Sequence, residues 1–561
     1  MKLDDLSSKE QVFYDFFVWL FDDKRITDKN IDLEKEIDIS LAPFYNDPNI
    51  YFPKQIEKFF ETSAMQRLGR ISQLDLSIDL YFNLYHNRLE HSKGVYYRKL
   101  EEMVYNFQNP NWKDKVEKEN LKLYLIAELI KMAGHDIGHF PLSHAMEEQV
   151  YSCHGAHEVV GKRIMLENPE INQVYTEISP ELPEIMHELY EKDIWNFREH
   201  DESSYDVDRL DYLQRDNIYW GTPVHLPYLQ YETVQVEVDA SNKPQKNNDG
   251  SIISLDASKN SIDVYSYENL QDIEHFLSLR ESGYVNKIYS VPYSHVREAS
   301  VGVFFKAFLE SPSACGKDLR HYITVLQTQK IEDIDLNLLL GWDEVKFYSE
   351  IIDIAQNHED ENIRQLATLT IPKLDAFLNI LYSSLNIHAK KGEYSEQEKT
   401  LLKKVKKIIS GNSELSQNLK NPDFIRSQTL FCNNPSNESI DINLQRLLEQ
   451  NIIFRQNKKV KAYNPKEPIY VRSSEGKIYE LSEHPERTCN WAEITTTLNS
   501  IFTYIPYLKY SVSHEDELTY IKNYFTRNGQ DFDAPSHETK INMQPLQVGN
   551  SLKNVFEEIE L

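Results

Sequence analysis

Cysteine is scarce in this chain, and its four cysteines stand far apart along the sequence. Cys153, Cys315, Cys432 and Cys489 form no Cys-x-x-Cys pair, so the sequence predicts neither a disulfide framework nor a zinc ribbon. A reducing compartment fits this use of cysteine, and we expect a cytoplasmic protein.

Long apolar runs and surplus positive charge are also missing. No stretch of about 18 apolar residues occurs, and the N-terminus lacks the apolar segment of a signal peptide. The 61 Lys and Arg residues are outnumbered by 89 Asp and Glu residues, which gives a formal net charge of −28. This balance opposes non-specific binding to nucleic acid and to anionic lipid, since both depend on surplus Lys and Arg. We therefore expect a soluble protein without membrane contact whose main partner is not nucleic acid.

The 561 residues exceed what one hydrophobic core usually organises, so we predict two or three folded units in a mainly α chain. An N-terminal helical appendage at 1–45 precedes a helical core at 46–430. An α+β region at 431–530 and a loosely held acidic tail at 531–561 complete the chain.

Helices are predicted where apolar residues recur at spacings of three and four. An aromatic helix at 11–21 is interpreted as docked on the main body, and its side chains, which need a surface to cover, also favour an oligomer. Further helices are predicted at 53–76, 87–107, 119–135, 155–167 and 204–215, and again between 268 and 410.

Strands are predicted where the apolar period changes to alternation. A β-hairpin near 233–263 leaves the helical core, with alternating arms at 233–238 and 252–255 and turn residues at 247–250 between them. In the C-terminal region, strands at 468–472 and 477–481 flank a Ser-Ser-Glu-Gly turn, and a further strand is predicted at 501–508.

The segment 128–144 carries most of the chemistry. An apolar helical run ends at His135 and Asp136, and His139 and His144 follow closely. Neutral imidazole together with carboxylate is a donor set that first-row transition metals accept, whereas Mg²⁺ and Ca²⁺ prefer oxygen donors alone. We therefore interpret the His-Asp pair as half of a metal site.

Two other segments supply the other half. His91 lies upstream in Arg-x-Glu-His-Ser, and Asp208 lies downstream in Val-Asp-x-x-Asp-Tyr-x-x-Arg-Asp. With His-Asp-Ile-Gly-His-x-Pro-x-Ser-His between them, these motifs resemble the dGTPase and dNTP triphosphohydrolase branch of the HD-domain phosphohydrolases. The resemblance covers about residues 50–310. It implies an HD-domain helical bundle with a small inserted β-hairpin, which the α+β C-terminal region follows here.

The resemblance also implies the ligands of the metal. Asp211 competes with Asp208, because both could face the bundle three residues apart, but the family pattern places the ligand directly after Val207. A divalent transition metal (Mn, Fe, Co, Ni or Zn) is expected, and Mg²⁺ on the triphosphate is a further option. The implied ligands are His91, His135, Asp136 and Asp208.

Three histidines after the His-Asp pair are implied to be catalytic. In the family, histidines at the places of His139, His144 and His157 surround the scissile phosphate and hand a proton to the leaving group. Glu147 matches a family carboxylate that pairs with the histidine equivalent to His157. A carboxylate behind an imidazole fixes its tautomer and raises its pKa, which suits proton transfer near neutral pH. Glu158 is the alternative carboxylate, although its position next to His157 would point it differently along a helix.

Substrate contacts are implied by the same motifs. Leu74 would pack against C2′ of the sugar and leave no partner or room for a ribose hydroxyl, so it favours deoxyribose. The implied contacts are Arg88 and Arg209 to phosphates, Tyr212 and Asp216 to the sugar, Gln73 to the 3′-hydroxyl, and Tyr293 in the helix after the hairpin.

The chain departs from the family pattern at two places. Val285 stands where the family has an arginine that contacts the triphosphate. Regulated members have an arginine where Gly69 stands and an aspartate where Glu61 stands, and these residues bind an activating guanine nucleotide. We therefore expect either constitutive activity or a dNTP activator that binds elsewhere.

The resemblance predicts metal-dependent hydrolysis of deoxynucleoside triphosphates to deoxynucleoside and tripolyphosphate. Family members form tetramers or hexamers, so we expect a homo-oligomer with possible allosteric control by a nucleotide activator. Two alternatives stay open. In the first alternative, the enzyme is of the same class but its substrate is (p)ppGpp, a cyclic dinucleotide or a nucleoside monophosphate. In the second alternative, the chain is a nucleotide-sensing regulatory protein with residual hydrolysis.

Overall fold

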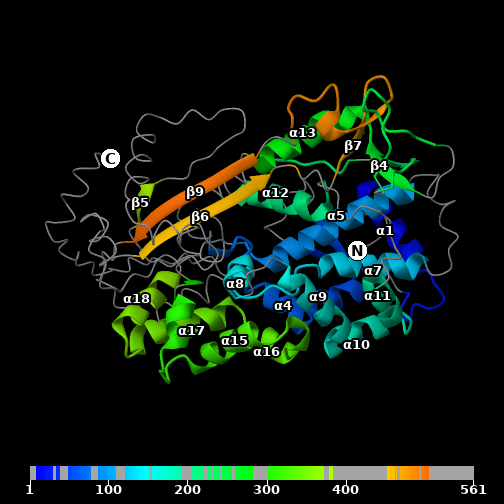
Figure 1. Cartoon of the computed structure of the whole chain (residues 1–561). Coiled ribbons are helices and arrows are strands. Elements are labelled where there is room, and N and C mark those ends of the chain that lie inside the picture. The colour runs from blue at the N-terminus through cyan, green and yellow to red at the C-terminus, as the bar shows by residue number, and fades with distance from the viewer. Residues whose placement is uncertain are drawn as a thin grey trace.

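The computed structural model of the chain describes most of its N-terminal two thirds and parts of the rest (Figure 1). Nothing between 383 and 451 or beyond 504 is among the described residues, so the predicted acidic tail lies outside them. The described residues are 8–29, 33–37, 49–76, 86–108, 121–150, 155–191, 205–219, 224–229, 231–240, 243–255, 260–281, 301–302, 304–371, 378–382, 452–461, 463, 468–491 and 495–504.

A bundle of helices forms the centre of the body. Helix α5 (Arg88–Gln108) packs against α7 (Leu121–Ala133) and α12 (Val207–Tyr219). Helix α7 is apolar almost all round, and a helix of this kind is buried in a core rather than laid on a surface. The surrounding helices are α3 (Lys54–Glu61), α4 (Ser63–Leu68), α8 (Ser143–Val150), α9 (Ala156–Glu167), α10 (Pro169–Ile178) and α11 (Leu182–Glu191).

Each predicted ligand segment belongs to this bundle. The helices predicted at 87–107, 119–135, 155–167 and 204–215 are confirmed with ends shifted by a few residues. Among the described residues, no helix combines the length and apolar character needed to cross a bilayer.

The N-terminal helix α1 (Ser8–Phe21) packs against α5 and α7. Phe16 and Phe17 are fully buried, and Phe13 stacks on Tyr97 of α5 with ring centroids 6.2 Å apart. The aromatic face is therefore covered by the chain's own core. The interpretation of this helix as docked on the main body is confirmed. Its aromatic face does not need another subunit, so oligomerisation stays a prediction without that support.

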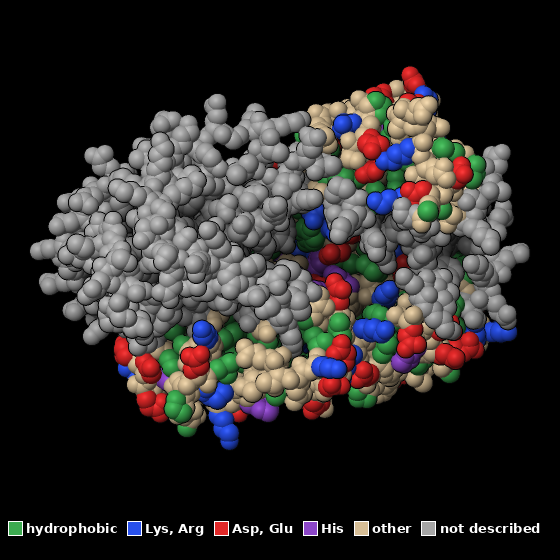
Figure 2. All heavy atoms as spheres, viewed as in Figure 1, with side chains coloured by type: hydrophobic (Ala, Val, Ile, Leu, Met, Phe, Trp, Pro, Cys, Tyr) green, Lys and Arg blue, Asp and Glu red, His purple; other side chains and the backbone are tan. Residues whose placement is uncertain are grey.

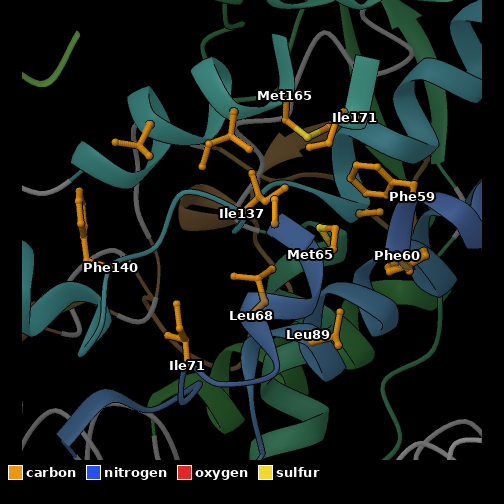
Figure 3. Close-up of a cluster of buried hydrophobic side chains, with 14 of the residues drawn as sticks. Phe59, Phe60, Met65, Leu68, Ile71, Leu89, Ile137, Phe140, Met165 and Ile171 are labelled. Carbon is orange, nitrogen blue, oxygen red and sulfur yellow. The ribbon is translucent and has the colours of Figure 1, made fainter. Parts of the chain in front are cut away.

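The helix predicted over 53–76 is broken and ends early. Thr62, with ψ of 147°, separates α3 from α4, and α4 ends at Leu68. Residues 69–76 form a turn and a loop, in which Ser72 pairs with Asn87 and Asp75 has a φ of +50°. Ile71 and Leu74 are nevertheless buried, and Figure 3 shows Ile71 beside Leu68 in the core. The three-residue spacing of Ile71 and Leu74 therefore indicates that both side chains are buried, but it does not indicate a helical backbone.

A second group of helices follows the hairpin region and shares the same hydrophobic core. Asp343 caps the longest of them, since its Oδ1 accepts from the backbone N–H of Lys346 at 2.9 Å. These helices are α15 (Lys317–Thr328), α16 (Leu336–Leu340), α17 (Glu344–Asn357) and α18 (Glu361–Thr370), with a 3₁₀ turn at Ile331–Asp333.

A hairpin is present within the predicted range and forms part of a larger sheet, but its second strand is 261–265 and not the predicted arm at 252–255, where Ile252 and Ser254 form isolated bridges. Strands β3 (Tyr231–Gln235) and β4 (Ser261–Tyr265) are antiparallel. Strand β7 (Tyr470–Arg472) pairs with β4 in parallel, and β8 (Ile478–Glu480) completes the order β3-β4-β7-β8. Gly476 has φ of +82° in the turn between β7 and β8, as the Ser-Ser-Glu-Gly signal predicts. The hairpin and the C-terminal strands thus share one sheet.

The remaining described elements lie around these units. Helix α13 (Leu270–Leu279) follows β4 after a 3₁₀ turn at Tyr267–Asn269, and another 3₁₀ turn at Leu481–Glu483 follows β8. The strand predicted at 501–508 overlaps β9, which begins earlier, and 505–508 is not described. The other strands are β1 (Leu33–Ile37) with β2 (Asn49–Pro53), and the antiparallel order β5 (Leu378–Tyr382), β9 (Thr495–Tyr504) and β6 (Ile452–Lys461).

Candidate active site

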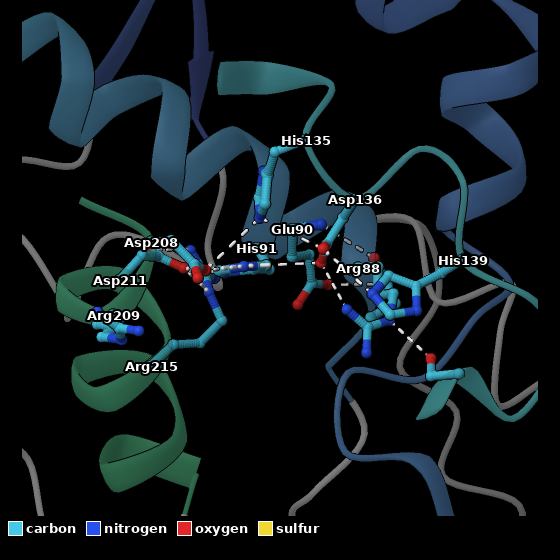
Figure 4. Close-up of polar contacts among 12 residues, drawn as sticks. Arg88, Glu90, His91, His135, Asp136, His139, Asp208, Arg209, Asp211 and Arg215 are labelled. Atoms are coloured by element: carbon cyan, nitrogen blue, oxygen red, sulfur yellow. Dashed lines mark hydrogen bonds and ion pairs between the residues drawn. The ribbon is translucent and has the colours of Figure 1, made fainter. Parts of the chain in front are cut away.

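Three segments of the bundle bring the predicted metal ligands together (Figure 4). His91 projects from the first turn of α5, Asp208 from the first turn of α12, and His135 from the turn that ends α7. Donor atoms of these three residues all lie within 4.8 Å of one another. His91 Nε2 is 2.9 Å from Asp208 Oδ1, and His135 Nε2 is 3.5 Å from the same oxygen.

Asp136 turns toward the same place. Its Oδ1 is 3.4 Å from His135 Nε2, and its Oδ2 is 3.7 Å from His91 Nε2. Arg88 Nη1 donates to Asp136 Oδ2 at 2.5 Å, which orients the carboxylate. The four predicted ligands therefore occupy one site.

Asp211 lies on the other side of the His91 ring. Its Oδ2 is 2.8 Å from His91 Nδ1, and Arg215 donates to both of its carboxylate oxygens at 2.9 Å. A carboxylate on the far ring nitrogen fixes the tautomer and leaves Nε2 for a metal. This geometry favours Asp208 over Asp211 as the fourth ligand.

The donor set fits a divalent transition metal. His135 Nε2 is buried and has no hydrogen-bond partner among the described residues, so this nitrogen can bind a metal ion. Burial alone would lower the pKa of His91, but Asp208 and Asp211 outweigh it and raise the pKa to about 10. The surrounding carboxylates therefore favour a positive charge at this point, and the nitrogen and oxygen donors suit a metal of this class.

A group of three histidines lies beside the metal ligands. Donor atoms of His139, His144 and His157 lie within 4.8 Å of one another, and the rings of His139 and His157 stack with centroids 3.9 Å apart. Burial, with Arg88 and His157 nearby, holds the pKa of His139 well below its usual value, so this ring is neutral. The predicted catalytic histidines are thus adjacent.

Glu147 of α8 supports two of these histidines. Its Oε1 is 2.7 Å from His157 Nδ1, and its Oε2 is 3.3 Å from His144 Nδ1. Burial alone would raise the pKa of Glu147, but the bonds to His144 and His157 outweigh it and lower the pKa, so the group is a carboxylate. Glu158 is exposed to solvent. The geometry favours Glu147 as the carboxylate behind His157.

The predicted phosphate contacts differ in their surroundings. Arg88 is buried and donates through Nε to Ser143 Oγ at 2.7 Å, in addition to its bond with Asp136. Arg209 is bonded to Asp206, the residue just before its own helix, with Nη1 2.8 Å from Oδ2. Figure 4 shows Arg209 on α12, farther from His139 than Arg88 is. To contact a phosphate, the Arg209 guanidinium would therefore have to bond the phosphate and Asp206 at the same time.

The predicted sugar contacts lie near the chain segment before α5. Gln73 and Asp216 each bury an oxygen, Oε1 and Oδ2, that has no hydrogen-bond partner among the described residues. Leu74 is 5% exposed and belongs to the main core. Tyr212 is half-buried with its ring centroid 6.5 Å from that of His91. Tyr293 lies outside the described residues, as does Val285.

Several buried residues join this region without having been predicted. His86 lies between the two sugar candidates, since its Nε2 is 2.7 Å from Asp216 Oδ1 and its carbonyl accepts from the backbone N–H of Gln73 at 3.2 Å. Its ring stacks on Tyr219 with centroids 4.2 Å apart. A histidine five residues before His91 gave a weak signal at most, and Glu344, which reaches the site from α17, gave none.

Figure 2 shows the setting of these residues. Histidine and acidic side chains gather in a hollow near the middle of this face, between the helical body and the region of the β3-β4-β7-β8 sheet.

No family model matches the chain, but several proteins are similar to parts of it. The uncharacterized protein YwfO of Bacillus subtilis is 37% identical over 172 residues, which are 30% of this chain and 37% of that protein. A putative HD domain-containing protein of Acanthamoeba polyphaga mimivirus is 32% identical over 29% of this chain and 39% of its own length. A Dictyostelium discoideum protein, a deoxynucleoside triphosphate triphosphohydrolase SAMHD1 homolog, is 25% identical over 30% of this chain and 34% of its own length.

The fold has a counterpart among solved structures. A phosphohydrolase of Bacteroides thetaiotaomicron superposes with a TM-score of 0.52 at 18% identity, covering 84% of this chain and all of that one. These likenesses support the HD-domain phosphohydrolase family. The chain has a mainly helical fold with a small β region, consistent with an HD helical domain. The chain spans well under half the length of the three curated relatives named above, so the substrate of an HD-domain hydrolase does not follow from them.

Proposed function

We propose that this chain hydrolyses deoxynucleoside triphosphates to deoxynucleoside and tripolyphosphate. The observation that carries the proposal is the position of Asp136 between the two histidine groups. Its Oδ1 is 3.4 Å from His135 Nε2 and 3.3 Å from His139 Nε2. A phosphoryl group bound at the metal site would therefore touch the catalytic histidines as well.

Proton transfer follows from the histidine group. A metal in the site would supply the Lewis acidity that activates water and polarises the phosphoryl group. His157, held by Glu147 on its Nδ1, keeps its other ring nitrogen to pass a proton to the leaving oxygen. Neutral His139 can donate one hydrogen bond to a phosphoryl oxygen.

The sugar side supports a deoxynucleotide. Gln73 and Asp216 both bond His86, and each has a buried oxygen, Oε1 and Oδ2, without a partner among the described residues, although buried acceptors are normally paired. A sugar hydroxyl would satisfy them. Leu74, adjacent to Gln73 in the same loop, offers no partner to a second hydroxyl, and the cost of burying an unpaired hydroxyl would disfavour ribose.

The test is product analysis. Purified protein is incubated with each dNTP and NTP and with Mn²⁺, Fe²⁺, Co²⁺, Ni²⁺, Zn²⁺ or Mg²⁺, and products are separated by ion-exchange chromatography. We expect deoxynucleoside and tripolyphosphate in equal amounts and slower cleavage of ATP than of dATP. The double variant His135→Ala/Asp136→Ala, prepared in parallel, controls for contaminating phosphatases. Orthophosphate or pyrophosphate as the first product would refute the proposal.

A further inference from the structure

Two buried ionisable residues lie behind the catalytic loop without a part in the proposed reaction. Arg67 of α4 is 3% exposed, and Glu344, the first residue of α17, is fully buried. Burying a charged side chain is costly unless its polar atoms are bonded. The partners of these two side chains therefore indicate what they do.

Arg67 bonds the loop that carries the His-Asp pair. Its Nη1 donates to the carbonyl of Ile137 at 3.3 Å, and its Nη2 donates to the carbonyl of His139 at 2.5 Å. Its Nε donates to the carbonyl of Trp342 at 2.7 Å. One planar guanidinium thus ties the loop between the metal ligands and the catalytic histidines to the residue two before α17.

Glu344 bonds both loops of the site. Its Oε1 accepts from the backbone N–H of Leu142 at 3.2 Å, and from the N–H and Oγ of Ser72 at 3.2 and 2.8 Å. The backbone N–H of Glu344 donates to the carbonyl of Arg70 at 3.1 Å. One carboxyl group therefore sets the distance between the loop before His144 and the loop that carries Gln73.

The backbone next to Leu142 needs such support. Leu142 and Ser143 have φ of +63° and +45°. Residues other than glycine adopt this backbone conformation only where the surrounding structure constrains them. Ser143 Oγ accepts from Arg88, which in turn bonds Asp136. The constrained turn thus connects Glu344 to a predicted metal ligand through Arg88.

We infer that Glu344 is a positioning residue, which with Arg67 forms a brace from the start of α17 to the catalytic loop 135–144. The brace keeps the histidines, Arg88 and the Gln73 loop at fixed distances. It lies outside the segment that resembles the dNTP triphosphohydrolases, since α17 begins after residue 310. The inference rests on the proposed function only in treating this loop as catalytic.

The test compares Glu344→Ala with Glu344→Gln. Glutamine keeps an acceptor oxygen at Oε1, whereas alanine leaves the backbone N–H groups of Leu142 and Ser72 without the one they bond here. We expect kcat to fall about 10–100-fold in Glu344→Ala with KM and metal content unchanged, because a supporting contact and not a ligand is lost. Glu344→Gln should recover kcat to within about threefold. The matched control, Glu350→Gln on the same helix, should behave as wild type.

Hydrogen exchange gives a second readout that does not depend on the substrate. The Leu142 amide should exchange about 10-fold faster in Glu344→Ala than in wild type and at the wild-type rate in Glu344→Gln. Wild-type kcat together with wild-type Leu142 exchange in Glu344→Ala would overturn the inference. If Glu344→Ala does not fold, Ser72→Ala, which removes one bond to Glu344, should show the same kcat loss in weaker form. If wild-type protein cleaves no dNTP, the proposed function fails. The exchange rate of the Leu142 amide then still tests whether Glu344 holds the loop.

Discussion

Glu147 holds His157 by two bonds at once: its Oε1 accepts from the backbone N–H of His157 at 2.6 Å and lies 2.7 Å from the ring Nδ1. The backbone and the ring of one histidine are therefore fixed by a single carboxylate oxygen. Such a bond settles which ring nitrogen carries a proton, and the free nitrogen becomes the one that exchanges protons with substrate.

Replacing Glu147 by glutamine should lower kcat about 10²–10³-fold, since general acid catalysis contributes this much and an amide no longer stabilises the protonated ring. Metal content should stay unchanged. The control is Glu158→Gln, the exposed carboxylate beside His157, which should keep wild-type kcat. A larger loss in Glu158→Gln than in Glu147→Gln would reverse the assignment.

The double variant His135→Ala/Asp136→Ala should lose both bound metal and hydrolysis, because two of four neighbouring donors disappear. Elemental analysis of the purified protein measures the first effect directly. His187→Ala changes an exposed histidine on α11 and should retain the wild-type metal content. Normal metal content in the double variant would remove the basis for the site.

Leu74→Ala should weaken the discrimination against ribose by about tenfold, measured as the ratio of kcat/KM for dATP and ATP. The side chain is 5% exposed in the core, so stability should also fall by about 2–5 kcal/mol. Leu76→Ala is the matched control, since Leu76 is buried in the same core and should lose stability without changing the ratio. Equal ratios in wild type and Leu74→Ala would contradict a role at C2′.

Glu344 should make stability depend on pH. Burial raises the pKa of its carboxyl group to about 8 from an ordinary value of 4.5. Between these values the unfolded chain releases the proton while the folded chain keeps it, so stability falls as pH rises from about 5 to 8. Glutamine does not titrate, and the Tm of Glu344→Gln relative to wild type should therefore increase over this range. A Tm difference that is constant at pH 5, 6.5 and 8 would contradict the buried acid.

The helices that carry His91, His135 and Asp208 could be predicted because ligand motifs and apolar periodicity fall in the same segments. The choice between Asp208 and Asp211 could not be predicted from the sequence. The two residues lie three positions apart on one helix, and only the rotation of α12 about its axis decides which of them faces Nε2 of His91. The sequence also could not predict that Ser72 bonds the side chain of Glu344. Glu344 lies far from Ser72 in sequence, and packing of α17 alone brings them together.

The loop at 69–76 shows a different limit. Buried Ile71 and Leu74 keep a helical spacing although the backbone turns away, so hydrophobic pattern alone misreads the segment. Contacts that hold a loop come from elsewhere in the fold, and here they come from Asn87 and Glu344.

The parallel pairing of β4 with β7 has a consequence for biosynthesis. Val264 and Tyr470 are neighbours in the sheet but about two hundred residues apart in the chain. A ribosome adds roughly 5–20 residues per second, so the outer edge of β4 stays without its partner for about 10–40 seconds during synthesis. An open strand edge invites pairing with other chains. Truncations that end before residue 468 should therefore aggregate even though every predicted metal ligand lies upstream of the cut.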